Sequence, residues 1–207
     1  MNYLSREGFY NSDTVQQKQE LSGETNFLRA ARNFNEEALT KIFDLYVAPL
    51  YNYALRLTGD ELLADNIVGD TFSKFLDQLH AGKGPNNNLR SYLYQTTYHL
   101  IVDEVRFNKR EAPLEIADCL FNIPSHKTTQ ILDQTDEKSL LDNVFEAIIE
   151  HLSEDQRHVI ILRFLEDFSI KETAEIIGKE VNNVKVIQNR GIAKLRKVLG
   201  IQLGEKI

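Results

Sequence analysis

Residues Phe168 to Leu199 read FSIKETAEIIGKEVNNVKVIQNRGIAKLRKVL, and two short helical patterns meet in this stretch at Gly178. Ser169 precedes the first pattern and Glu172 follows it by three residues, which is the spacing of a capping box at a helix start. Gly178 is placed to end the same helix. We therefore predict a first short helix between Ser169 and Ile177.

A second helix is predicted to begin near Asn182. Its apolar and small residues recur every three or four positions, which gathers Val184, Ile187, Gly191 and Leu195 on one side. The small Ala174 lets the two helices approach closely, and Gly178 supplies the turn between them. This spacing is typical of a helix-turn-helix, in which the second helix enters the major groove of DNA.

The charge of the second helix agrees with this interpretation. Five basic residues and no acidic residue lie between Asn182 and Lys197, although the whole chain has a formal net charge of -7. Contacts with phosphate need local cations, not a basic protein. A solvated amphipathic helix is the alternative for the charge alone, and the spacing of the packed residues argues against it.

Composition limits the remaining possibilities. The chain has 207 residues, and its single cysteine, Cys119, excludes an internal disulfide framework and a cysteine-based zinc cluster. No apolar run reaches membrane-spanning length, and the first twenty residues lack the apolar core of a signal peptide. We expect a soluble, cytoplasmic protein without membrane insertion.

The chain before residue 111 shows three amphipathic helical patterns. They cover about residues 34–58, with Pro49 inside, then 62–80 and 89–108. Residues 81–88 interrupt them with turn-forming residues at nearly every position, which predicts an exposed loop. Residues 1–33 show little periodicity and are predicted to be a loose leader.

Residues 111–138 hold two prolines, few periodic positions and excess acidic residues, which predicts a flexible linker. Helical patterns resume from residue 139 to 200, and residues 201–207 form a tail. Ser153 and Gln156 have capping-box spacing before a further helix to Leu165. No convincing strand pattern is found, so the predicted fold is all-α with two small helical domains, 34–110 and 139–200.

Several stretches together resemble bacterial sigma factors of the extracytoplasmic-function (ECF) group. The stretch from Tyr46 to Asp60, YVAPLYNYALRLTGD, looks like the first helix of the family's region 2. The residues Leu89 to Tyr94, with His99, Leu100, Asp103 and Arg106, are similar to its promoter-melting helix. The segment from Leu152 through Arg163 and the helix-turn-helix look like region 4.

This resemblance implies a function in transcription initiation. Such proteins bind the clamp and flap of core RNA polymerase, carry the enzyme to promoter DNA and hold the melted strand. They catalyse nothing themselves, so the resemblance implies no catalytic residue, metal or cofactor. A region-2 helical bundle and a region-4 helix-turn-helix domain correspond to the two predicted domains.

The resemblance also assigns candidate site residues. The segment that docks on the polymerase clamp corresponds to Asp65, Asn66, Val68, Asp70 and Phe72. Capture of the minus-10 element and promoter melting correspond to Asn86, Asn87, Asn88, Arg90, Tyr92, Tyr98 and Arg106. An exposed amide-rich loop can hydrogen-bond the edge of a flipped base while aromatic side chains stack on it. Half-buried packing is the alternative role for the tyrosines.

The recognition helix is expected to read the minus-35 duplex. The expected base-reading residues are Asn182, Asn183, Lys185, Val186, Asn189 and Arg190, and the expected backbone contacts are Lys171 and Lys194. Asparagine can make a bidentate contact to adenine, and arginine to guanine or phosphate.

The sequence departs from the family at three places. Asn66 and Gly69 replace acidic and glutamine residues, Val186 and Ile187 replace serine and arginine, and Tyr98 replaces a basic residue. Asn66 and Gly69 make a standard polymerase contact less expected, whereas Ile187 falls on the packed side of its helix. The outward Val186 cannot donate a hydrogen bond to a base, and Tyr98 leaves fewer cations for the single strand. We therefore hypothesise that promoter reading depends partly on another protein, either an anti-sigma regulator or a DNA-bound recruiter.

Two other functions are considered. A stand-alone helix-turn-helix regulator would bind DNA without polymerase and would need a ligand pocket or dimer surface in residues 34–110. A hydrolase or metal enzyme would need motifs such as HExxH or a phosphate-binding GxxxxGK[ST] loop, and the sequence contains neither.

Overall fold

The computed structural model describes residues 27–111 and 136–200, with side chains described for 27–107 and 143–200. All regular structure in these ranges is helical, which confirms the predicted all-α class. The helices are α2 (Glu36–Thr58), α3 (Glu61–His80), α4 (Leu89–Glu111), α5 (Asp136–His151), α6 (Glu154–Phe164), α7 (Ile170–Ile177) and α8 (Val181–Val198). None of these helices combines the length and apolar character that spanning a bilayer requires.

The helix boundaries in the N-terminal unit, residues 27–111, follow from local capping. The side chain of Asn35 accepts a hydrogen bond from the Ala38 N–H at the start of α2, and Asp60 does the same for Leu63 at the start of α3. Gly59 ends α2 with a φ of 67°, a left-handed conformation that glycine adopts without strain. The predicted breaks at residues 58–60 and 81–88 are confirmed.

The N-terminal unit starts earlier than predicted. Residues 27–32 are helical, and both Leu28 and Ala31 are buried in the core. Part of the segment predicted as a loose leader is therefore packed structure, because the two apolar side chains, three residues apart, lie on one helix face. Residues 1–26, the rest of that leader, and residues 201–207 lie outside the described residues.

The C-terminal unit, residues 136–200, contains α5 to α8. Helix α5 already begins at Asp136, inside the segment predicted as a linker, and residues 112–135 of that segment lie outside the described residues. Ile148, Leu152 and Ile160 form a small cluster beneath α8, with Ile192 and Leu195 packed against it. The predicted capping box before α6 is present, since the Gln156 side chain accepts a hydrogen bond from the Ser153 N–H at 3.0 Å.

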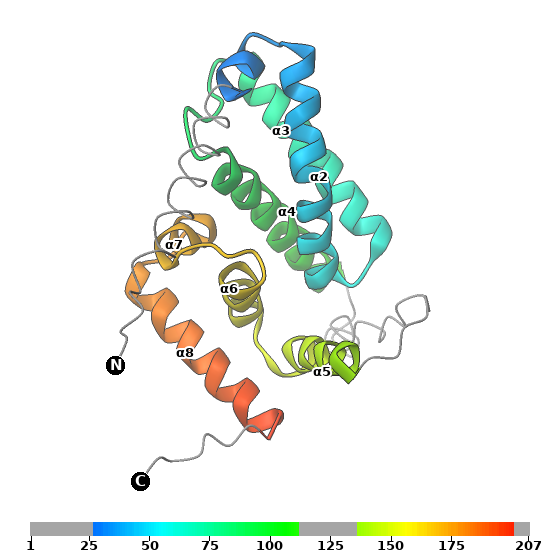
Figure 1. Ribbon diagram of the computed structural model, residues 1–207, viewed down its shortest axis with the longest axis vertical. Helices are drawn as coiled ribbons and strands as arrows, with labels where there is room; N and C mark the ends of the chain where they lie inside the picture. Colours follow the sequence, from blue (N-terminus) through cyan, green and yellow to red (C-terminus); the bar gives the residue numbers. More distant parts are fainter. Residues whose placement is uncertain (1–26, 112–135, 201–207) are drawn as a thin grey trace, which may run out of the picture.

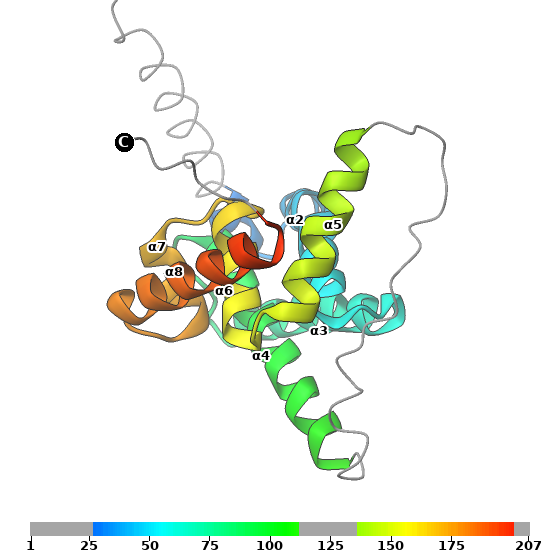
Figure 2. The ribbon, with the colours of Figure 1, turned by 90° about the horizontal axis from the view of Figure 1, so that it is seen from below.

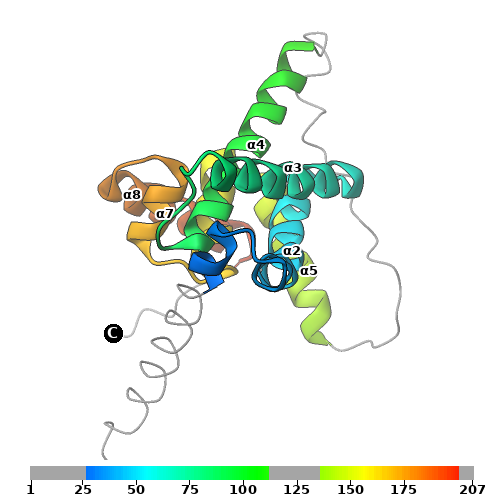
Figure 3. The same ribbon diagram turned by 90° about the horizontal axis from the view of Figure 1, so that it is seen from above.

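The two units pack against each other. Figure 1 shows α4 between the α2–α3 pair and the helices α6 and α7, and the view in Figure 2 shows α5 in front of α2. At the end of α2, the Arg56 guanidinium lies 5.5 Å from the ring centroid of Phe145 on α5. One continuous core contains Leu50, Tyr53 and Leu93 from the N-terminal unit together with Val159, Leu162 and Ile176 from the C-terminal unit. The far end of α4 extends away from this body (Figure 3). The predicted division into two separate domains stays a prediction, and in this structure the two units share one apolar interior.

Candidate nucleic-acid interface

The turn between α7 and α8 has the predicted geometry. The Ser169 hydroxyl accepts a hydrogen bond from the Glu172 N–H at 3.2 Å, and the Glu172 carboxylate accepts one from the Ser169 N–H at 2.7 Å. Gly178 ends α7 with a φ of 64°. Each group satisfies a backbone position that would otherwise lack a partner at a helix end, so the predicted capping box and turn are confirmed.

Helix α8 presents two different faces. Val184 is fully buried and Gly191 packs against α6, where a β-carbon on Gly191 would lie 3.3 Å from Ile160 Cγ1. The predicted packing side is therefore confirmed. The predicted DNA-contacting residues are all exposed, namely Asn182, Asn183, Lys185, Val186, Asn189, Arg190, Lys171 and Lys194. Their contact with DNA stays a prediction.

Arg163 on α6 links this helix to α8 and to the start of α7. Its Nε donates a hydrogen bond to the side-chain oxygen of Gln188 on α8 at 3.1 Å, and its Nη1 donates to the Phe168 carbonyl. Across the same unit, Lys179 Nζ lies 3.1 Å from Asp155 Oδ2. These contacts fix the start of α7 and the side of α8 to α6.

The predicted minus-10 loop has an exposed tip. Asn86, Asn87 and Asn88 are exposed, and the Asn88 carbonyl accepts a hydrogen bond from the Tyr92 N–H in the first turn of α4. Asn88 has a φ of 52°, a conformation that asparagine tolerates better than most residues. The three amide side chains are thus available to solvent beside the start of α4.

The side chains predicted to assist this loop are less accessible. Tyr92 is half-buried against Phe75, with ring centroids 6.1 Å apart. The Arg90 guanidinium lies 4.0 Å from the ring centroid of Phe168 in the C-terminal unit. Tyr98 exposes 9% of its surface and meets the ring of His158 at 4.7 Å. Arg106 alone among the basic and aromatic candidates is exposed on α4, 3.8 Å from Asp103.

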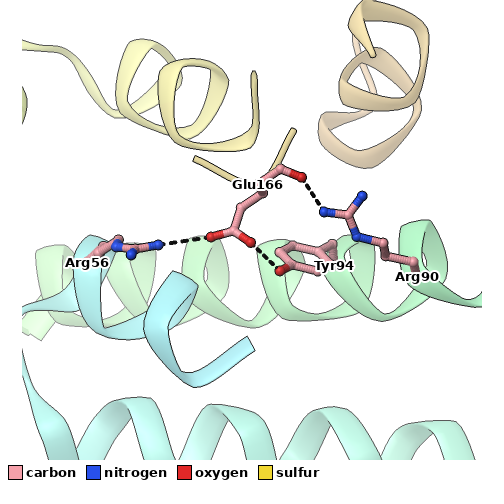
Figure 4. A network of polar contacts seen from close by, with 4 residues as sticks. All are labelled: Arg56, Arg90, Tyr94 and Glu166. Atoms are coloured by element: carbon pink, nitrogen blue, oxygen red, sulfur yellow. Dashed lines mark hydrogen bonds and ion pairs between the residues drawn. The ribbon is translucent and has the colours of Figure 1, made fainter. Parts of the chain in front are cut away.

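A buried carboxylate joins the two units. Glu166, 8% exposed, accepts a hydrogen bond from Arg56 Nη1 at 3.0 Å and one from the Tyr94 hydroxyl at 2.5 Å. The Glu166 backbone carbonyl accepts a further hydrogen bond from Arg90 (Figure 4). Burial and the neighbouring carboxylate both raise the pKa of Tyr94, so this hydroxyl stays protonated and donates.

A buried histidine lies beside this network. The Tyr53 hydroxyl and His158 Nδ1 share a hydrogen bond of 2.9 Å, and both side chains are almost fully buried. His158 Nε2 has no hydrogen-bond partner among the described residues. Burial, with a smaller contribution from Arg157, lowers the pKa of His158 to about 3. The imidazole is therefore neutral at physiological pH.

The predicted clamp-binding segment of α3 is only partly on the surface. Asp65, Asn66 and Asp70 are exposed. Val68 and Phe72, however, are 5% and 9% exposed, and Phe72 packs against Phe43 with ring centroids 4.8 Å apart. Both belong to the packed face of the helix, so Asp65, Asn66 and Asp70 are the accessible members of the predicted segment, and its contact with the clamp stays a prediction.

The exposed face of α3 includes apolar residues that the sequence analysis missed. Leu62 and Leu76 are 72% and 41% exposed. They share a stripe with Asn66 and Gly69, because the positions 62, 66, 69 and 76 follow one another by four, three and seven residues, that is, by one or two helical turns. Reading the period outward from Asn66 would have found both leucines.

The polar network at Glu166 was also missed. Its partners Arg56 and Tyr94 precede it by 110 and 72 residues, and no local spacing links them.

The residues that the structure describes contain no group of histidine, cysteine and carboxylate side chains that could hold a metal ion.

Comparison with known proteins identifies the family. The family description "Sigma-70 region 2" matches residues 42–111, and "Sigma-70, region 4" matches residues 142–195, together more than half of the chain. The ECF RNA polymerase sigma factor SigX of Bacillus subtilis is 28% identical over 168 residues, covering 78% of this chain and 84% of SigX. The chain belongs to the sigma-70 family, in its ECF group.

Two solved structures have a similar fold. The sigma factor RpoE of Bartonella quintana, solved with the anti-sigma factor NepR, aligns with a TM-score of 0.64 at 22% identity, covering 79% of this chain and 98% of RpoE. CnrH, solved with the cytosolic domain of CnrY, aligns with a TM-score of 0.63 at 20% identity, covering 87% of this chain and 99% of CnrH. The N-terminal unit is called region 2 below and the C-terminal unit region 4.

Proposed function

We propose that this ECF sigma factor binds core RNA polymerase, reads a promoter at two points and holds the melted strand while transcription starts. Region 4 reads the minus-35 duplex with the exposed face of α8, and region 2 reads the minus-10 element with Asn86, Asn87 and Asn88. The observation that carries the proposal is the presence of both regions in one chain, with a solvent-facing basic and amide-rich recognition helix. The chain catalyses no step itself and works in the cytoplasm with the polymerase.

The exposed stripe of α3 supports the polymerase contact. Asp65, Asn66 and Asp70 offer carboxylate and amide groups, and Leu62 and Leu76 add apolar area on the same helix. Exposed apolar residues rimmed by polar ones are typical of protein interfaces. We assign this stripe to the clamp, with Val68 and Phe72 supporting it from below.

Promoter reading in this proposal requires the two regions to separate. Tyr98 is covered by His158, and Arg90 is held by Phe168 and Glu166 of region 4. A base cannot stack on Tyr98 while this side chain is buried against His158. The packed form described above is therefore a resting form, and the DNA-bound form has α6 displaced from α4.

Regulation by another protein is part of the proposal. RpoE was solved with the anti-sigma factor NepR, and CnrH was solved with the cytosolic domain of CnrY. By analogy, and because Val186 and Tyr98 remove polar contacts to DNA, we propose an anti-sigma factor or a DNA-bound recruiter as a partner of this chain.

An in vitro transcription assay tests the function. The purified chain is added to core polymerase on a library of genomic fragments, and a pull-down with core polymerase is run beside it. We expect initiation from a subset of fragments and retention on the polymerase. A chain that binds fragments but never the polymerase would instead be a stand-alone regulator. Tight minus-35 binding without any helper would contradict the partner hypothesis.

A further inference from the structure

Arg32 reaches from the N-terminal segment to the loop between α3 and α4. Its Nη2 donates hydrogen bonds to the Gly84 carbonyl at 2.6 Å and the Pro85 carbonyl at 2.8 Å, and its Nε donates to the same Pro85 carbonyl at 3.2 Å. The bonds cross more than fifty residues of sequence. A planar guanidinium can hold two successive carbonyls at once, whereas a lysine ammonium offers one point charge.

The short helical segment that carries Arg32 is packed into the region-2 core. Leu28 and Ala31 on the same short helix are buried in the region-2 core, at 1% and 0% exposure. Phe34 makes an edge contact with His80 at the end of α3, with ring centroids 4.7 Å apart. The segment that carries Arg32 therefore has a fixed position relative to α3.

The loop has a fixed stem and an exposed tip. Gly84 is buried, and a β-carbon there would lie 2.5 Å from Leu79 Cδ2, so the chain passes directly over α3 at this point. After Pro85 come the exposed residues Asn86 to Asn88, and the chain is fixed again where Asn88 accepts a hydrogen bond from the Tyr92 N–H. Only a short exposed stretch lies between two fixed points.

We propose that Arg32 is a positioning residue for minus-10 recognition: by holding the Gly84 and Pro85 carbonyls, it sets the asparagine tip in the conformation that receives unstacked bases of single-stranded DNA. The inference rests on the proposed function of the loop. Its physical basis is preorganisation, because a loop fixed before binding loses less conformational freedom when the base arrives. Arg32 precedes the residues matched to region 2, which begin at residue 42.

The test compares full-length Arg32→Ala and Arg32→Lys with the wild type and with Arg29→Ala, an exposed arginine on the same short helix. Each protein is combined with core polymerase on a promoter and on single-base variants of its minus-10 element. Strand opening is followed by the fluorescence of 2-aminopurine at the flipped position. Core binding, binding to a minus-35 duplex and melting temperature are measured on the same samples.

We expect Arg32→Ala to lose roughly three- to tenfold of the discrimination between the minus-10 variants, since such losses follow from a small misplacement of a recognition group. Arg32→Lys should fall between wild type and Arg32→Ala, while Arg29→Ala should match wild type. Core binding and minus-35 binding should be unchanged, which a general loss of folding would not produce.

Two results would overturn the inference. The first is that Arg32→Ala discriminates between the minus-10 variants as well as an active wild type does. The inference then fails, and the proposed function stands. The second is that Arg32→Lys and Arg32→Ala reduce strand opening equally on all promoter variants, in proportion to a lower melting temperature. Arg32 would then have a purely structural role. If the wild type opens no promoter with core polymerase, the proposed function fails and the inference fails with it.

Discussion

Glu166 connects region 4 to region 2 through both its side chain and its backbone. One carboxylate accepts hydrogen bonds from Arg56 on α2 and Tyr94 on α4, while its own backbone carbonyl accepts from Arg90. A buried carboxylate is costly unless it is paired and hydrogen-bonded, and here both oxygens have partners. Because these partners lie on two different helices of region 2, the network fixes the orientation of region 4 relative to region 2.

Replacing Glu166 tests this role. We expect Glu166→Ala to lower the free energy of unfolding by about 2–4 kcal/mol, because the Tyr94 hydroxyl and Arg56 then lose a buried partner. Denaturant titration followed by circular dichroism measures the change. Glu37→Ala is the matched control, since its bridge to Lys41 is exposed and should matter little. Equal effects of both substitutions would contradict the assigned importance of Glu166.

His158 should make stability depend on pH. Its pKa is lowered to about 3 in the folded chain, against about 6.5 when unfolded, so the unfolded state binds more protons between these values. Stability is therefore full above about pH 7 and falls as the pH drops toward 3. Between pH 7.5 and 5.5 we expect a loss on the order of 1 kcal/mol from this residue.

Denaturant titrations at the two pH values measure the loss. His158→Gln keeps a hydrogen-bonding side chain beside Tyr53 but does not titrate, so its stability should change less over the same range. An identical pH dependence in wild type and His158→Gln would assign the effect to other groups.

At the scale of helices, two glycines occupy opposite environments. A β-carbon on Gly69 of α3 would meet nothing within 4 Å, whereas one on Gly191 of α8 would lie 3.3 Å from Ile160. Glycine inside a helix costs about 1 kcal/mol relative to alanine. Gly69→Ala should therefore stabilise the chain by roughly 0.5–1 kcal/mol.

Gly191→Ala is the matched comparison for Gly69→Ala. Its gain in helix propensity is offset by the close approach to buried Ile160, so we expect a smaller gain or a loss. Thermal unfolding of both variants gives the answer. A larger gain at Gly191 than at Gly69 would show that α8 can move away from α6.

The exposed face of α8 makes its own prediction. Arg190→Ala should weaken binding to a minus-35 duplex and reduce the slope of log affinity against log salt by about one unit if Arg190 contacts phosphate. Fluorescence anisotropy between low and moderate salt measures the slope. Glu175→Ala, an exposed acidic control on α7, should leave it unchanged or make it steeper. An unaltered slope for Arg190→Ala would remove the phosphate assignment.

The helices were largely predictable because their signals are local. Ser169 with Glu172, Gly59 and Gly178 each act within a few residues, and the period of Val184 and Gly191 indicated the packed side of α8 correctly. The contacts of Glu166 and His158 were not predictable, since their partners are separated from them by 72 to 110 residues. The burial of Val68 and Phe72 also follows from a local signal, because the helical period places them on the side of α3 that carries Ala64 and Phe75.

For the whole molecule, the shared core keeps the two regions together, whereas the proposed function requires them to separate. Tyr53, Tyr94 and Tyr98 are buried between the regions, and promoter reading requires the regions to part. Helices α4 and α7 also share the hydrogen bond from Gln95 to the Glu175 carbonyl at 3.1 Å, so separation breaks several contacts together.

Separation can be measured by energy transfer between dyes. In a Cys119→Ser chain, cysteines replace the exposed residues Asp44 in region 2 and Glu150 in region 4, which have no assigned role in binding DNA or polymerase. We expect high transfer in the free protein and lower transfer in the open complex with core polymerase. Glu166→Ala should lower transfer in the free protein as well. Unchanged transfer in a complex whose DNA is demonstrably melted would contradict the separation.

The buried tyrosines also provide an optical signal that needs no label. The chain contains no tryptophan and eight tyrosines, so its absorbance at the long-wavelength aromatic band, and the emission excited there, come from tyrosine. The Tyr94 hydroxyl donates to the Glu166 carboxylate and the Tyr53 hydroxyl shares a hydrogen bond with the His158 imidazole, and in the parted form both hydroxyls would lose these region-4 partners. Separation of the two regions should therefore change the tyrosine absorbance and emission of the unlabelled protein.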